Sequence, residues 1–192
     1  MASLFDTLEL GAFRAGITAR TEESKKWFQA NIKKLGQVNR TSLLKDDALD
    51  PVTKTVFGNM YMYFYDPKYK EELPYYDTFP LVLPIERYSD GFLGINFHYL
   101  PIPLRMKLLD RIMSFANSQD LDETSTRIIA DYSKLKKLPI IKPTLHKYLY
   151  SQVKSQFRRV DADEFKIACL LPVQRFKKAS ATEVWGDSRS MI

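Results

Sequence analysis

Residues 55–100 concentrate hydrophobic side chains in three short runs that turn-forming residues separate. The runs read GNMYMYFYDP, TFPLVLPIE and FLGINFHYL, and they are rich in tyrosine, phenylalanine and β-branched residues. This pattern predicts antiparallel strands. With a fourth strand expected over 52–57, the sequence predicts a small, strongly bent antiparallel sheet or an SH3-like barrel over about residues 52–100.

The first run has two chemically different faces. Its even positions 60, 62 and 64 are Met, Met and Phe, whereas its odd positions 61, 63 and 65 are all Tyr. Because side chains alternate across a strand, both faces of this strand can be covered. Tyr75 and Tyr76 add to an aromatic set that could stack ligands, but packing in the core and against other subunits is the favoured interpretation.

Proline and glycine limit where the other two runs can lie in the sheet. Pro80 and Pro84 lack the N–H donor of a central strand, so the second run is expected at a sheet edge or around a bulge. Gly94 in the third run indicates a bend or a close approach of two backbones.

Helical spacing dominates outside this region. A helix is predicted from Thr21, which can cap it, to about Gly36. After residue 100 the hydrophobic spacing predicts a cluster of helices. Their expected ranges are 104–116, about 122–138, 144–160 and 162–171. The fold class is therefore α+β, with an N-terminal helix, the sheet, and a C-terminal cluster of helices.

The chain length of 192 residues fits a single domain over 1–192. An extended N-terminal arm is expected over 1–20 and a polar C-terminal tail over 173–192. Trp185 and Phe176 are the aromatic side chains of this tail. We expect them to pin the tail, either to the body of the protein or to a partner.

Charge is segregated along the chain. Residues 14–45 hold eight basic residues (Lys or Arg) and two acidic residues. Residues 46–133 hold eight basic and fourteen acidic residues, and residues 134–178 hold twelve basic and three acidic residues. An acidic centre is thus flanked by two basic regions. This suits either a nucleic-acid surface or contacts between oppositely charged faces of neighbouring subunits.

The C-terminal basic region supplies the candidate binding residues. On the helix expected over 144–160, Lys147, Lys154 and Arg158 share one face, and Tyr148 and Tyr150 could stack on unpaired bases. The full candidate set is Lys134, Lys136, Lys137, Lys142, Lys147, Lys154, Arg158 and Arg159. A face that meets an acidic neighbouring subunit is the favoured alternative to DNA.

No residue set in the sequence indicates catalysis. His98 and His146 have no partner at metal-ligand spacing, Cys169 is the sole cysteine, and no nucleotide-binding glycine motif is present. We therefore expect no cofactor, no metal and no enzymatic activity. No apolar run approaches the roughly 20 residues of a membrane span, so no membrane partner is expected.

Three segments together resemble a known family. They are GNMYMYFYDPKYKEELPYYDTFPLVLPIE, GFLGINFHYLP with the helix after it, and LPVQRFKKA with the later VWGDSR. They resemble small virion-associated proteins of T4-like contractile-tailed bacteriophages, over most of residues 21–189. Some such proteins protect DNA ends near the neck and others are tail or baseplate components. The family has no catalytic motif to transfer.

The resemblance implies a virion protein made in the host cytoplasm. The first hypothesis is a non-enzymatic structural component of the tail, baseplate or neck that binds other virion proteins within a symmetric multi-subunit assembly. The alternative is a DNA-end-binding protector that uses the basic C-terminal residues.

Overall fold

The computed structural model describes residues 3–19, 21–115 and 135–192. The helices of these residues are α1 (Leu4–Arg14), α2 (Glu22–Lys34), α3 (Arg40–Leu43), α4 (Ile102–Phe115), α6 (Phe165–Leu170) and α7 (Ala181–Met191), with 3-10 turns η1 (Phe97–Tyr99), η3 (Pro139–Thr144), η4 (Tyr150–Gln152) and η5 (Ala162–Glu164). The strands are β1 (Asp50–Val52), β2 (Met60–Met62), β3 (Tyr76–Asp77), β4 (Leu81–Arg87), β5 (Gly91–Asn96), β6 (Leu145–Leu149), β7 (Phe157–Val160) and β8 (Phe176–Lys177). The helix expected over about 122–138 falls mostly outside the described residues.

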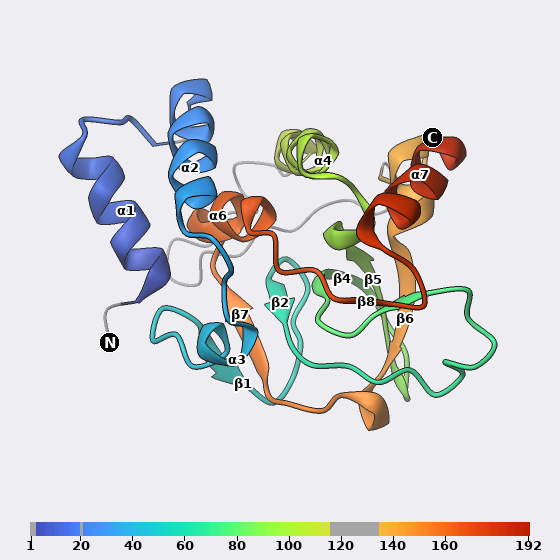
Figure 1. The fold of residues 1–192 in the computed structure, drawn as a ribbon. Coiled ribbons are helices and arrows are strands. Elements are labelled where there is room, and N and C mark those ends of the chain that lie inside the picture. Colours follow the sequence, from blue (N-terminus) through green and yellow to red (C-terminus); the bar gives the residue numbers. More distant parts are fainter. Residues whose placement is uncertain (1–2, 20, 116–134) are drawn as a thin grey trace.

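Six strands form one antiparallel sheet in the order β1-β7-β2-β4-β5-β6, while β3 and β8 pair separately (Figure 1). The predicted α+β class is confirmed. The described strands form an open sheet and do not close into a barrel. Of the two predicted alternatives, the bent sheet is therefore correct and the SH3-like barrel is wrong. The strand expected over 52–57 is wrong, because β1 ends at Val52 and pairs with β7.

The sheet is strongly curved. Strands β5 and β7 have β2 and β4 between them, which in a flat sheet would separate them by roughly 14 Å. Yet the rings of Phe92 on β5 and Phe157 on β7 lie only 6.2 Å apart. The concave face therefore encloses an aromatic core made of Tyr61, Tyr63, Tyr65, Val82, Phe92, Tyr148 and Phe157.

The two-faced strand behaves as its sequence predicts. Met60 and Met62 are fully buried in the larger core, against which Phe64 also packs. The three tyrosines at 61, 63 and 65 point to the opposite side and join the aromatic core. The prediction that both faces are covered is confirmed.

Strand β4 lies in the middle of the sheet, between β2 and β5. The sequence predicted either a position at the sheet edge or a bulge for this strand. The edge position is wrong and the bulge is confirmed. The register shifts between Pro84 and Glu86, and this irregularity accommodates the missing N–H donor.

Helices cover the outer face of the sheet, with α2, α4 and α6 on one side of it in Figure 1. Thr21 caps α2 through a reciprocal pair of hydrogen bonds with Ser24, as the sequence predicts. Leu108 and Ile112 of α4 are buried in the larger core, together with Phe165 and Ile167 of α6.

Both ends of the chain pack on this body. Residues 4–14 form α1, and its Phe5 and Leu8 lie in the larger core instead of extending away from it. Residues 181–191 form α7, with Ser180 as its cap and Val184 fully buried. The termini are therefore helices docked on the sheet and its connections.

The helix predicted over 144–160 is wrong. This segment forms β6, the turn η4 and β7, and its two strands pair with β5 and β2. Leu145, Leu149, Val153 and Phe157 recur at a helical spacing, but β5 and β2 each have an edge whose backbone groups need partners. Pairing in the sheet outweighs the local preference of the segment.

Replacing Gly91 tests this pairing. A Cβ atom at Gly91 would lie 1.9 Å from the backbone oxygen of Tyr148, so β6 would have to move away. We expect Gly91→Ala to lower the free energy of unfolding in urea by about 1–3 kcal/mol. Gly186 in α7 is the matched control, because a Cβ there meets nothing within 4 Å and Gly→Ala inside a helix should add about 0.5–1 kcal/mol. If Gly91→Ala were neutral, β6 would not lie against β5.

Candidate nucleic-acid interface

The predicted basic residues do not share a helix face. Lys136 and Lys137 precede η3, Lys142 lies within η3, Lys147 is on β6, Lys154 follows η4, and Arg158 and Arg159 are on β7. Lys134 lies outside the described residues. The stripe predicted for Lys147, Lys154 and Arg158 does not form, because the segment that holds them is β6, η4 and β7 and not one helix.

Three of these cations contact other parts of the chain. Arg158 donates to the backbone oxygen of Leu49 at 3.2 Å. Arg159 pairs with Asp50 and with Asp161, holding β7 to β1. Lys147 pairs with Asp90 at 3.0 Å.

The other four lysines are exposed. Lys136, Lys137, Lys142 and Lys154 form no ion pair with any residue that the structure describes. Their ammonium groups can therefore meet phosphates without first breaking an ion pair within that part of the chain.

An aromatic groove of about 520 Å³ lies between β6 and the loop 66–74. Five tyrosines line it, namely Tyr65, Tyr69, Tyr76, Tyr99 and Tyr148. Lys68 and Lys147 also line it, from the loop and from β6 respectively. Of the two tyrosines predicted to stack, Tyr148 lines this groove, whereas Tyr150 is not among its lining residues.

The loop 66–74 is not among the candidate binding residues that the sequence indicates, although it lines the groove. Tyr69 is 57% exposed and the ammonium group of Lys68 lies 5.3 Å from the centre of its ring. The alternation of lysine and tyrosine in KYKEELPYY was the available signal.

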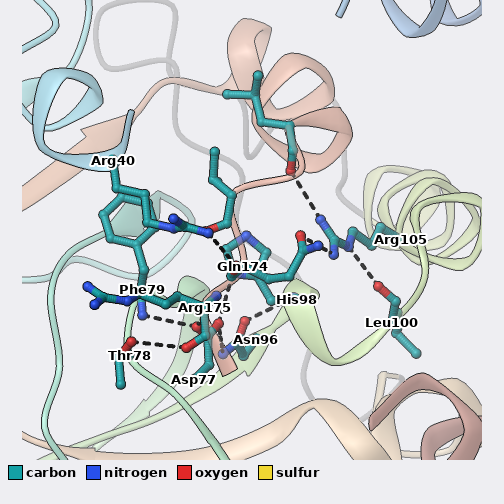
Figure 2. Close-up of polar contacts among 12 residues, drawn as sticks. Arg40, Asp77, Thr78, Phe79, Asn96, His98, Leu100, Arg105, Gln174 and Arg175 are labelled. Carbon is teal, nitrogen blue, oxygen red and sulfur yellow. Dashed lines mark hydrogen bonds and ion pairs between the residues drawn. The ribbon is translucent and has the colours of Figure 1, made fainter. Parts of the chain in front are cut away.

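Asp77 forms the buried polar end of the groove and joins three segments of the chain (Figure 2). Its carboxylate accepts hydrogen bonds from Nδ1 of His98 at 2.8 Å, the backbone N–H groups of Phe79 and Arg175 at 3.0 Å each, and Nδ2 of Asn96 at 3.3 Å. Burial tends to raise the pKa of Asp77. The His98 ring and the two backbone donors outweigh burial and lower this pKa below its ordinary value.

His98 is neutral at pH 7, because burial lowers its pKa in spite of the neighbouring carboxylate. A carboxylate can only accept, so Nδ1 of His98 holds the proton and Nε2 is the unprotonated nitrogen. Nε2 is buried without a hydrogen-bond partner among the described residues. His98 therefore orients the carboxylate of Asp77.

His146 contributes a second neutral ring, inside the groove. It stacks on Tyr99 with ring centres 3.9 Å apart, and its Nε2 donates to the backbone oxygen of Pro143 at 3.1 Å. Burial lowers the pKa of His146 to about 4. The groove thus presents aromatic surfaces at neutral pH.

Arg105 is buried and structural. Its Nε donates to the backbone oxygen of Leu100 at 2.7 Å and its Nη2 to the side chain of Gln174 at 3.0 Å, so it joins α4 to the segment before β8 (Figure 2). Burial lowers its pKa to about 10, which leaves it charged at neutral pH.

The two aromatic residues proposed for partner contact pack on their own chain. Trp185 donates from Nε1 to the backbone oxygen of His98 at 2.9 Å. The ring of Phe176 lies 5.2 Å from that of Tyr99. Of the two possibilities for Trp185, contact with the body is observed, and a role of either residue toward a partner stays a prediction.

The described residues contain neither a cluster of metal-binding side chains nor a membrane-spanning helix. No group of three or more His, Cys, Asp or Glu in this part of the chain could hold a metal ion. None of its helices is long and apolar enough to span a membrane.

His146 should make stability depend on pH. An ordinary histidine has a pKa of about 6.5 in the unfolded chain, so a folded-state pKa of about 4 stabilises the fold fully above pH 6.5 and progressively less as the pH falls toward 4. Between pH 7 and pH 5 we expect the wild-type protein to lose about 2 kcal/mol more unfolding free energy than His146→Gln, measured in urea. His98 is present in both proteins, so its titration cancels in the comparison. Equal losses would show that the pKa of His146 is not lowered in the folded protein.

Comparison with known proteins gives one family. A family model described as phage T4 terminal DNA protecting protein matches residues 10–188. No curated protein and no solved structure matches the chain. Since the family model covers nearly the whole sequence, the chain belongs to the phage T4 terminal DNA protecting protein family.

Proposed function

We propose that this protein binds the ends of linear phage DNA and shields them from exonucleases. The observation that carries the proposal is the family match over residues 10–188, because the description of the family names terminal DNA and its protection. DNA is accordingly the partner that the family implies.

The distribution of charge supports the proposal. The chain has a formal net charge of +6, and Lys136, Lys137, Lys142 and Lys154 are exposed on the described surface. Cations of this kind neutralise backbone phosphates and release counterions, which gives affinity without sequence preference. A protein that protects any terminus needs that kind of affinity.

The family match favours the DNA-end protector over the first hypothesis, a tail or baseplate component. Neither a tail nor a baseplate is named in the description of the family. Location in the virion, contacts with other virion proteins and the lack of enzymatic activity stay predictions.

Protection of ends can be measured directly. We expect linear duplex DNA to survive a processive exonuclease when the protein saturates its ends, and to be degraded without it. Protection should weaken steeply between 50 and 200 mM salt, because binding releases counterions.

A competitor separates ends from duplex in general. Unlabelled linear fragments should abolish protection, whereas the same mass of closed circular DNA should reduce it only weakly. Degradation at saturating protein, or equal competition by the circle, would contradict the proposal.

Two classes of basic residue should differ in their effects. Replacing Lys136, Lys137, Lys142 and Lys154 together by Ala should weaken DNA binding at least about tenfold and flatten its salt dependence, while leaving the unfolding midpoint in urea unchanged. Arg159→Ala should instead lower stability by about 1 kcal/mol with DNA affinity nearly retained, because Arg159 pairs with Asp50 and Asp161.

Replacing Lys26, Lys33, Lys34 and Lys45 together by Ala removes the same four charges from another part of the surface, since all four are exposed, and so controls for the loss of charge alone. An equal loss of affinity in this control would show that overall charge, and not the C-terminal lysines, determines binding.

A further inference from the structure

Two hollows in the described surface differ in their suitability for DNA. The larger, of about 1000 Å³, lies among α1, α2, α4 and α6, and carboxylates of Glu9, Glu22, Asp110 and Asp163 line it. Its Lys25 is paired with both Glu22 and Asp110. Its four carboxylates outnumber its two lysines, whereas two lysines balance two carboxylates in the aromatic groove beside β6, so that groove is the better candidate.

The groove is preorganised on the side of the loop. Lys178 donates from Nζ to the backbone oxygens of Lys70, Glu71 and Leu73, at 2.7, 2.9 and 3.2 Å. Lys70 also pairs with Asp66 at 3.0 Å. These contacts fix the loop 66–74, so that Tyr69 is held in place although it is 57% exposed.

The opposite side is fixed as well. The hydroxyl of Tyr65 accepts a hydrogen bond from the backbone N–H of Leu149 at 3.1 Å, and the ring of Tyr65 lies 5.0 Å from that of Tyr148. Tyr99 and His146 continue the aromatic surface. Tyr65, Tyr99 and Tyr148 are only 7%, 5% and 4% exposed, so they form a fixed wall of the groove, whereas the exposed ring of Tyr69 offers the face on which a flat ligand can stack.

We propose that this groove binds an unpaired nucleotide at the terminus of the DNA, an inference that rests on the proposed function. Every base has a π face, and stacking on aromatic side chains tolerates any sequence. Within a duplex those faces are covered by neighbouring base pairs. An unpaired terminal base can therefore enter the groove at a much lower energetic cost than an internal base.

The size of the groove agrees with such a ligand, and its lining holds Lys68 and Lys147 beside the carboxylates of Asp77 and Asp90. Its volume of about 520 Å³ lies within the range of roughly 300–1,000 Å³ found for sites that enclose small molecules. Lys68 forms no ion pair with a described residue, so its ammonium group beside Tyr69 is available to the adjoining phosphate. Lys147 on the other side is already paired with Asp90 and contributes less.

Fluorescence of 2-aminopurine tests the inference. The probe is placed as the single unpaired terminal base of a duplex, and a second duplex holds it at an internal paired position. We expect the protein to quench the terminal probe and to leave the internal probe unchanged. Tyr69→Ala should reduce quenching and weaken binding of the overhang about tenfold, with blunt-duplex binding changed less than twofold. Lys68→Ala should weaken binding of the overhang without abolishing quenching at saturation.

Phe13→Ala is the matched control, because Phe13 is an aromatic residue 79% exposed on α1 and does not line the groove. It should leave quenching and affinity unchanged. Tyr69→Phe, which keeps the ring, should behave as the wild type does.

The outcomes separate this inference from the function on which it rests. If ends are protected but the terminal probe is not quenched, or Tyr69→Ala has no effect on it, the groove proposal fails and the proposed function stands. If the probe is quenched in the groove but exonucleases still degrade the DNA, the groove proposal stands and the protecting function fails. Absence of any DNA binding overturns both.

Discussion

The carboxylate of Asp77 accepts hydrogen bonds from residues that lie as much as 98 positions away in the sequence. It joins the end of β3 to the turn after β5, through His98 and Asn96, and to the chain entering β8, through the N–H of Arg175. A buried charge without such partners would cost several kcal/mol, so the three segments can be placed only together. Because Asp77 lines the end of the groove, the same contacts that stabilise the fold also set the geometry of the groove.

The curvature of the sheet depends on the aromatic core that the Asp77 network adjoins. Tyr148 contacts both systems, because its ring packs on Tyr63 while its hydroxyl accepts a hydrogen bond from Asn96. Large rings from β5, β6 and β7 pack together on the concave face of the sheet, as the short distance between Phe92 and Phe157 shows. The groove is the outer margin of this curved aromatic surface. Its tyrosines are therefore held rigidly by the core behind them.

Local features of the sequence predicted a large part of the fold. The cap at Thr21, the alternation of Met and Tyr in β2 and the hydrophobic stripe of α4 each depend on neighbours in the chain, and each was predicted correctly. Strands β6 and β7 were missed because their strand character comes from the open edges of β5 and β2, which are remote in sequence. The groove was missed for the same reason. Lys68 and Tyr69 meet β6 only after residues about 80 positions apart have come together.

Because residues 145–160 form the strands β6 and β7 and not a helix, the charges of this segment act differently from those of a helical stripe. A single helical stripe would have offered one continuous track for phosphates, which cannot distinguish a terminus from the interior of a duplex. Instead, Arg158 and Arg159 hold β7 in place and Lys147 is paired with Asp90. Of the remaining exposed lysines, Lys136, Lys137 and Lys142 lie in and before η3, and Lys154 follows η4. In the proposed function, such charge would supply affinity for the DNA backbone but no preference for position along it. Preference for an end must come from a feature that only an end can satisfy, and a rigid aromatic groove that accepts an unpaired base meets that requirement.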